Sequence, residues 1–177
     1  MTKLLLYRCV GLAMLLVFAA ALPAQRRRDP LTQAEIDQVR DASWEPQQRL
    51  GLYVKFARAR LVGIEQMRND PKTKDRGLQT HDMLDDFLLI YDELNDNIDT
   101  YVDRKDDIRK PMKLVIEADT EFQAKLRALK DAADVAPEEA KKFEFILSTA
   151  LDTVDSSVEE HRQLLTELEE TAKHKKK

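Results

Sequence analysis

The stretch LDDFLLIYDELNDNIDTYVDRKDDIRKPMKLVIEADTEFQAKLRAL, residues 84–129, decides the fold. Its apolar side chains recur about every 3.5 residues, the spacing that lets one stripe of a helix pack against neighbouring helices. This apolar seam consists of Leu84, Phe87, Tyr91, Leu94, Ile98, Tyr101, Ile108, Met112, Val115, Phe122, Leu126 and Leu129. Two seam positions are not apolar, Lys105 and Asp119.

Pro111 interrupts the middle of this stretch. Proline lacks an N–H and collides with the carbonyl four residues before it, so one straight helix through residues 84–129 is disfavoured. The stretch therefore predicts two helices, joined by a tight turn around Arg104–Lys110 and folded back on each other.

The composition of the 177-residue chain agrees with a single all-helical domain. Charged residues make up 35%, aromatic residues make up 6%, and there are only four glycines. Too few glycines remain for the tight turns of a multi-stranded sheet or for a glycine-rich phosphate loop.

Residues 1–24 have the features of a secretory signal peptide. Lys3 and Arg8 precede an apolar run of 14 residues from Cys9 to Leu22, and small residues follow. That run is short for a membrane span, which needs about 20 residues. We expect cleavage after Ala24, with an uncleaved anchor as the alternative, and a periplasmic or secreted mature protein without any cysteine.

The mature chain is acidic, and it carries no later apolar run long enough to cross a membrane. The formal net charge is −4 for the full chain and −6 after removal of the signal peptide with Lys3 and Arg8. An acidic protein is a poor partner for a nucleic-acid backbone. We therefore expect no nucleic-acid binding.

The helical periodicity and the turn signals divide the rest of the chain into five expected helices. These are a lead helix at Gln33–Ala42, opened by a Thr32/Glu35 capping box, and four longer helices at Pro46–Arg68, Leu78–Arg104, Ile108 or Pro111 to Ala132, and Pro137–Ala172. Short turns favour antiparallel neighbours, so the expected architecture is an up-down-up-down four-helix bundle spanning residues 32–172. The lead helix and Trp44 are expected to pack on the helix at Pro46–Arg68.

Both ends of the mature chain are basic. Residues 25–31, which include Arg26, Arg27 and Arg28, are expected to form a disordered leader. Residues 173–177 form a lysine-rich tail, which suits the negative end of a helix dipole.

An acidic stripe lies on the helix at Leu78–Arg104, opposite its apolar face. Its residues fall within roughly 60° of one another at about 100° per residue. They are Asp85, Asp92, Asp96, Asp99 and Asp103. The stripe could attract cations or a basic partner, and it could equally be a solvated face.

His161 and Met112 are the candidate residues for a cofactor. His161 falls on the apolar face of the last helix, and Met112 lies on the facing seam. A histidine and a methionine inside a four-helix bundle could ligate a haem, so a bundle that binds haem or a metal is the alternative hypothesis. Otherwise we expect His161 to hydrogen-bond to a tyrosine or a carboxylate.

Other site chemistry has little support in this sequence. Di-iron bundles need inward Glu-x-x-His pairs, and neither His81 nor His161 has a glutamate three residues before it. The segment Asn95–Thr100 lacks the central glycine of an EF-hand calcium loop. There is no Gly-x-Ser-x-Gly motif and no mature cysteine nucleophile. We therefore expect a non-enzymatic protein that needs no cofactor and acts through protein–protein contact or self-association, as a scaffold, an adaptor or a stress-related binding protein.

Overall fold

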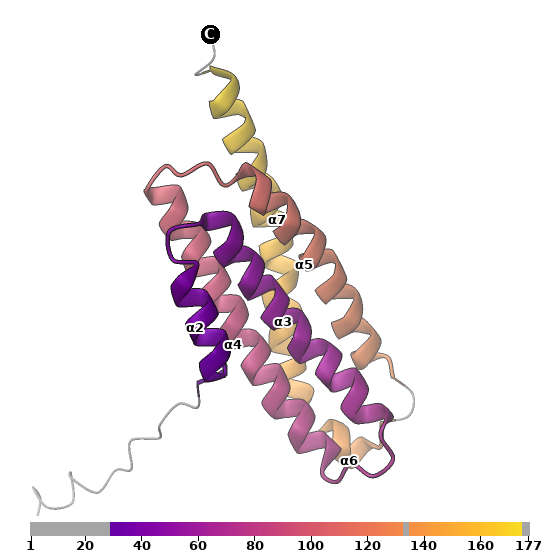
Figure 1. The fold of residues 1–177 in the computed structure, drawn as a ribbon. Helices are drawn as coiled ribbons and strands as arrows, with labels where there is room; N and C mark the ends of the chain where they lie inside the picture. Colours follow the sequence, from indigo (N-terminus) through magenta and orange to yellow (C-terminus); the bar gives the residue numbers. More distant parts are fainter. Residues whose placement is uncertain (1–28, 133–134, 175–177) are drawn as a thin grey trace, which may run out of the picture.

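The computed structural model describes residues 29–132 and 135–174, and every regular element in these ranges is an α-helix (Figure 1). The predicted all-helical bundle is therefore confirmed. In chain order the helices are α2 (Gln33–Asp41), α3 (Pro46–Asn69), α4 (Arg76–Asp103), α5 (Arg109–Lys130), α6 (Pro137–Ala140) and α7 (Glu144–His174). The expected signal peptide, most of the leader and the last three lysines lie outside the described residues.

The four long helices alternate in direction along the chain (Figure 1). The most extensive packing joins α3 to α4 and α5 to α7, and α3 also packs along α5. The α4 and α5 backbones are not close neighbours, so these two helices do not form the expected hairpin. The connection at residues 104–108 can reach about 16 Å, enough to cross the end of a bundle whose helices lie about 10 Å apart. The two halves of the seam therefore meet across the core.

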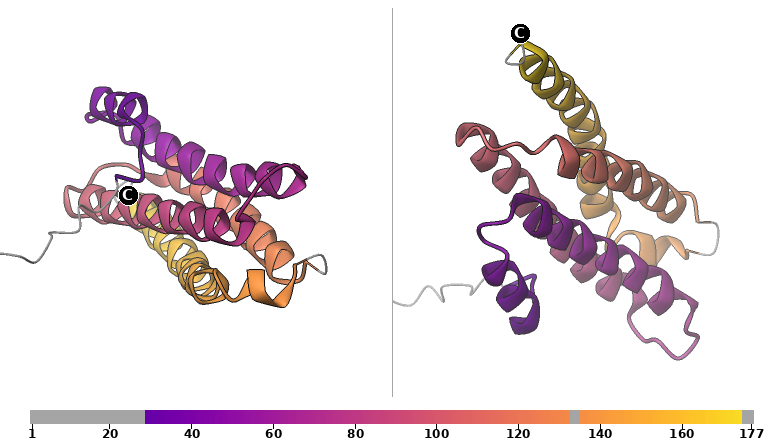
Figure 2. Two further views of the ribbon diagram at one scale, coloured as in Figure 1. Left: turned by 90° about the horizontal axis from the view of Figure 1, so that it is seen from below. Right: turned by 45° about the horizontal axis from the view of Figure 1, so that its top comes forward.

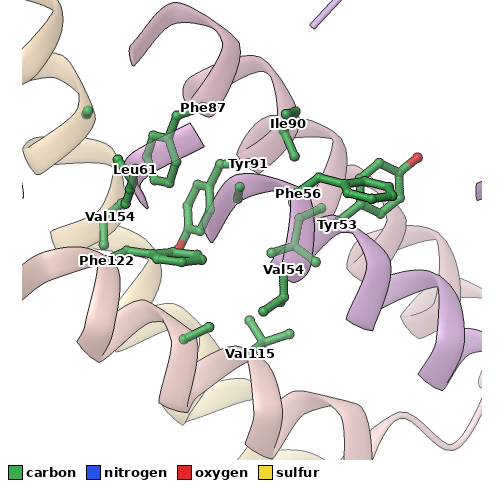
Figure 3. Close-up of a cluster of buried hydrophobic side chains, with 14 of the residues drawn as sticks. Tyr53, Val54, Phe56, Leu61, Phe87, Ile90, Tyr91, Val115, Phe122 and Val154 are labelled. Atoms are coloured by element: carbon green, nitrogen blue, oxygen red, sulfur yellow. The ribbon is translucent and has the colours of Figure 1, made fainter. Parts of the chain in front are cut away.

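The core is built from apolar residues of all four long helices, and its centre is aromatic. The Phe87 and Tyr91 rings of α4 stack with centroids 5.7 Å apart, and Phe122 of α5 meets Phe87 edge-on at 5.4 Å. Figure 3 shows these three rings turned toward one another, with Val154 of α7 beside them. Such pairs contribute about 0.5–1.5 kcal/mol beyond their burial.

The lead helix α2 begins with the predicted capping box. The Thr32 hydroxyl accepts from the Glu35 N–H at 3.3 Å, and the Glu35 carboxylate accepts from the Thr32 N–H at 2.8 Å. The same carboxylate pairs with Arg60 of α3 at 2.7 Å, and Arg60 also donates to the Pro30 carbonyl at 2.7 Å. Residues 29–31 of the expected leader are thus placed beside α3, and α2 packs on α3 as expected.

The prediction that Trp44 packs on α3 is wrong, because the side chain is 82% exposed. It lies in the short turn between α2 and α3, immediately before the Glu45 cap and the first-turn Pro46. Val39 and Ala42 are the buried residues at this junction, so they cover α3 there in place of the indole.

Helix α4 ends in a tight turn that places Lys105 in a left-handed conformation, with φ of 61°. The Asp106 N–H donates to the Tyr101 carbonyl and the Lys105 N–H to the Val102 carbonyl, a Schellman motif. Glycine usually occupies the left-handed position. Pro111 lies in the first turn of α5, where its missing N–H removes no intrahelical bond.

The single helix predicted from Pro137 to Ala172 is interrupted at its start. The short α6 ends at Ala140, and α7 begins only at Glu144. Between them, the buried Phe143 turns into the core beneath the guanidinium of Arg68, whose carbon lies 5.8 Å from the ring centroid. Arg68 also pairs with Glu139 at 2.7 Å. These contacts hold the segment around the interruption against α3, and α6 itself lies against the first turn of α4.

Candidate functional site: a polar network inside the bundle and an exposed end

Asp119, the charged residue in the apolar seam, lies inside the bundle and is fully buried. Its Oδ1 accepts a hydrogen bond from the Tyr91 hydroxyl at 2.7 Å. Its Oδ2 lies 2.8 Å from Nδ1 of His161. Each of the three side chains comes from a different helix, α4, α5 and α7, so the network joins three of the four long helices.

Both oxygens of the Asp119 carboxyl group have a polar neighbour. The Tyr91 hydroxyl donates to Oδ1, and Nδ1 of His161 lies within hydrogen-bond distance of Oδ2. Burial raises the pKa of Tyr91, and the charge of Asp119 and its hydrogen bond raise it further. The tyrosine therefore stays a neutral donor at neutral pH. Together these contacts offset the cost of a buried carboxylate.

Two further polar side chains extend the network. Ser157 lies one turn before His161 on α7 and is buried, and its hydroxyl is 3.4 Å from Nδ2 of Asn95 on α4. The Asn95 Oδ1 is buried, and it has no hydrogen-bond partner among the residues that the structure describes. The structure thus places a serine one turn away from the paired His161 and Asp119, a grouping that the sequence did not indicate. The serine nearby is paired with Asn95, and the group lies in the core.

His161 and Met112 are not brought together as the haem hypothesis needs. Met112 is fully buried, but it lies seven residues before Asp119 on α5, about 10 Å along the helix axis. His161 is level with Asp119, and its Nδ1 is engaged there. This pairing agrees with the other expectation, a histidine hydrogen-bonded to a carboxylate.

Within residues 29–132 and 135–174, no three His, Cys, Asp or Glu side chains cluster so that they could hold a metal ion. None of the helices in these ranges is long and apolar enough to cross a membrane.

The acidic stripe lies on the outer face of α4. All five aspartates are exposed, and none has an ion-pair partner among the residues that the structure describes. Partial burial and the neighbouring charge of Asp96 raise the pKa of Asp92. The stripe residues therefore repel one another without a compensating cation. They are Asp85, Asp92, Asp96, Asp99 and Asp103.

A second feature is the end of the bundle where α3 begins and where α7 continues past its neighbours (Figure 1). We call this the α7 end, and it comprises Trp44–Gln47, residues 104–113 and residues 164–174. The right-hand view of Figure 2 shows the last turns of α7 projecting there. A surface hollow of 540 Å³ lies beside Trp44 and is lined by both acidic and basic groups, among them Glu45, Arg109, Lys113 and Glu169.

The opposite end carries a matching exposed aromatic residue. Phe145, in the first turn of α7, is 85% exposed. In the part of the chain that the structure describes, each end thus presents an exposed aromatic side chain, and the α7 end combines it with a projecting helix.

Comparison with protein-family models, with curated proteins and with solved structures finds no match for this chain.

The sequence did not identify Asp119 and Tyr91 as members of a polar network. The signal was present, because Asp119 occupies a seam position where every third or fourth neighbour is apolar. A charged residue at such a position indicates either a break in the helix or a buried partner. Tyr91 was interpreted as an apolar seam residue, although a buried tyrosine hydroxyl usually needs a hydrogen-bond partner.

Proposed function

We propose that this protein is an exported, non-enzymatic helical bundle that acts through contact with another protein at the α7 end. One observation carries the proposal: Trp44, the only tryptophan in the chain, is 82% exposed beside a projecting helix. Tryptophan is enriched among the residues that supply most of the binding energy at protein interfaces.

The surroundings of Trp44 suit a contact surface. The neighbouring hollow mixes acidic and basic groups, which would give orientation and specificity to a partner. The polar network of Asp119, in contrast, is enclosed by the core.

A photocrosslinking experiment in the native host tests the proposal. A benzophenone amino acid replaces Trp44 in one variant and Phe145 in a matched control, which removes an equally exposed aromatic at the other end. We expect a covalent protein adduct from position 44 and none from position 145. Adducts only from position 145, or from neither position, would overturn the assignment to the α7 end.

Export is part of the proposal and rests on the signal-like residues 1–24. A periplasmic or secreted location predicts that the protein recovered from the envelope or medium begins at Gln25. Mass spectrometry of the intact protein would identify this start. A start at Met1 in the membrane fraction would favour the uncleaved anchor.

The alternative function is a bundle that binds haem or a metal through His161. It is favoured by the contact between Nδ1 of His161 and the Asp119 carboxylate, because a carboxylate that accepts from Nδ1 is the usual support of a histidine that ligates a metal through Nε2. Absorbance after haem addition separates the two functions. A Soret shift that is lost in His161→Ala supports the alternative, and an unchanged spectrum removes it.

A further inference from the structure

A hollow of 620 Å³ lies between α2 and the parts of α3 and α4 beside it. We infer that this hollow binds a free α-amino acid with an apolar side chain. Its volume falls within the range of small-molecule sites, about 300–1,000 Å³. None of its lining residues belongs to the α7 end, so the inference does not depend on the proposed function.

Part of the lining is apolar. Ile36 and Val39 of α2 line the hollow, as do Leu31 just before that helix and Leu89 of α4. Val39 is buried, and the other three are half-buried. An apolar side chain placed against them would be removed from water, which is favourable.

Charged side chains of both signs also line the hollow. Two are cationic and two are anionic: Arg40, Arg49, Asp29 and Glu93. Arg40 already pairs with Asp37 at 2.6 Å, and a carboxylate oxygen of Asp29 accepts from the Leu31 N–H at 2.9 Å. A ligand with a single charge would meet like charges in this lining, whereas a zwitterion can match both signs.

Arg49 and Glu93 are the charges left for such a ligand. Neither has an ion-pair partner in the part of the chain that the structure describes, although both line the same hollow. The Nε of Arg49 is also buried without a hydrogen-bond partner among these residues. A buried donor without an acceptor is costly, and a carboxylate is an acceptor that a guanidinium binds well.

Tyr53 of α3 lies close to both of these charges. The guanidinium carbon of Arg49 is 5.9 Å from the centroid of the Tyr53 ring. Burial is the main cause of the raised pKa of Tyr53, while the charge of Arg49 opposes the rise and the charge of Glu93 adds to it. The carboxylate and ammonium groups of an α-amino acid share one carbon, so they suit two opposite charges near the same hydroxyl.

The walls of the hollow are held in place without a ligand. Arg60 of α3 pairs with Glu35 of α2 at 2.7 Å and also donates to the Pro30 carbonyl at 2.7 Å. Tyr53 is itself buried. A preformed site needs little ordering when it binds, which favours affinity for a ligand as small as an amino acid.

Isothermal titration calorimetry of the full chain tests the site. The probes are L-leucine, L-isoleucine and L-phenylalanine, and we expect at least one of them to bind. Matched analogues lack the ammonium, the carboxylate or the side chain, and for L-leucine these are isocaproate, isoamylamine and glycine. Each analogue should bind roughly tenfold more weakly or worse, since a lost hydrogen bond to a charged group costs about that much.

Two variants remove the proposed ligand contacts one at a time. Arg49→Met and Glu93→Gln should each weaken binding of the amino acid by roughly tenfold or more. Lys55→Met on α3 and Asp96→Asn on α4 are the matched controls, at exposed positions outside the hollow, and they should bind like wild type. Circular dichroism checks that the variants fold, and the exposed Glu93 keeps the test decisive if Arg49→Met does not.

Three results would overturn the site: no heat with any of the three amino acids, equal affinity for an analogue that lacks a charge, or full affinity in both Arg49→Met and Glu93→Gln. Crosslinking at position 44 is a separate measurement at the α7 end. An adduct there without amino-acid binding would keep the proposed function and reject this inference.

Discussion

Asp119 and His161 are 42 residues apart in the chain, yet Oδ2 of the one and Nδ1 of the other lie 2.8 Å apart inside the bundle. The hydrogen bond joins the centre of α5 to α7, and the Tyr91 hydroxyl ties the same carboxylate to α4. Apolar side chains alone would let α5 and α7 pack against each other in several neighbouring registers of similar energy. A buried polar pair disfavours them, because each shift would leave a buried charge without its partner.

Removing Asp119 and His161 together should destabilise the fold less than the sum of the two single losses. Asp119→Leu strands two buried donors and His161→Leu strands a buried carboxylate, so each single change should cost about 3–5 kcal/mol. In the double variant the penalties overlap, and the coupling energy should be about 1–3 kcal/mol. Urea unfolding of the four proteins gives this value. If the double variant lost as much stability as the two single variants together, Asp119 and His161 would not interact directly.

The raised pKa of Tyr91 predicts a loss of stability at alkaline pH. The unfolded tyrosine titrates near 10.0, whereas the folded one holds its proton to higher pH. Its contribution is therefore complete below pH 10.0 and falls as the pH rises above that value, because the unfolded state then releases a proton.

Tyr91→Phe should flatten the decline of stability above pH 10.0, measured by urea unfolding at several pH values. It should not abolish the decline, since burial also raises the pKa of Tyr53 and of Tyr101. The same slope in the variant and in wild type would show that the pKa of Tyr91 is not raised in the folded protein.

Replacing Lys105 by glycine should stabilise the protein. Lys105 ends α4 with φ of 61°, and a side chain in this conformation costs roughly 1–2 kcal/mol that glycine avoids. We expect Lys105→Gly to raise the free energy of unfolding by about 1 kcal/mol over Lys105→Ala, the matched control that keeps a Cβ. Equal stabilities would mean that the turn does not hold this conformation.

Replacing either of two glycines by alanine should change the stability of the protein, in opposite directions at the two positions. A Cβ on Gly77 would come within 2.8 Å of the Glu139 carbonyl oxygen, so Gly77→Ala should displace α6 and cost about 1–3 kcal/mol. A Cβ on Gly51 meets nothing nearer than 3.7 Å, so Gly51→Ala should add roughly 0.5–1 kcal/mol through helix propensity. Thermal unfolding compares them. A stable Gly77→Ala would argue against the close packing of α6 on α4.

The sequence predicted the helices well because their signals are local. The capping box at Thr32, the first-turn proline at Pro46 and the apolar period each act within a few residues, and helix boundaries fell close to expectation. The interruption between α6 and α7 was missed because its cause is distant. Arg68 holds Glu139 and covers Phe143 from a helix some seventy residues earlier.

The candidate site was less predictable for the same reason. Whether His161 meets Met112 or Asp119 depends on the register of α7 against α5, and the apolar period alone does not set that register. The exposure of Trp44 depends on whether Val39 and Ala42 already cover α3. The acidic stripe, in contrast, follows from helix geometry alone, and it lies on the outer face of α4 as expected.

The most direct test of the central claim is the state of Trp44 with and without a bound protein. Labelling the chain with 5-fluorotryptophan gives a single ¹⁹F signal, since the sequence has one tryptophan. We expect a solvent-exposed signal in the dilute protein, which shifts and loses solvent contact in the complex identified by crosslinking. A signal that is already shielded in the dilute monomer, or that is unchanged in the complex, would contradict it.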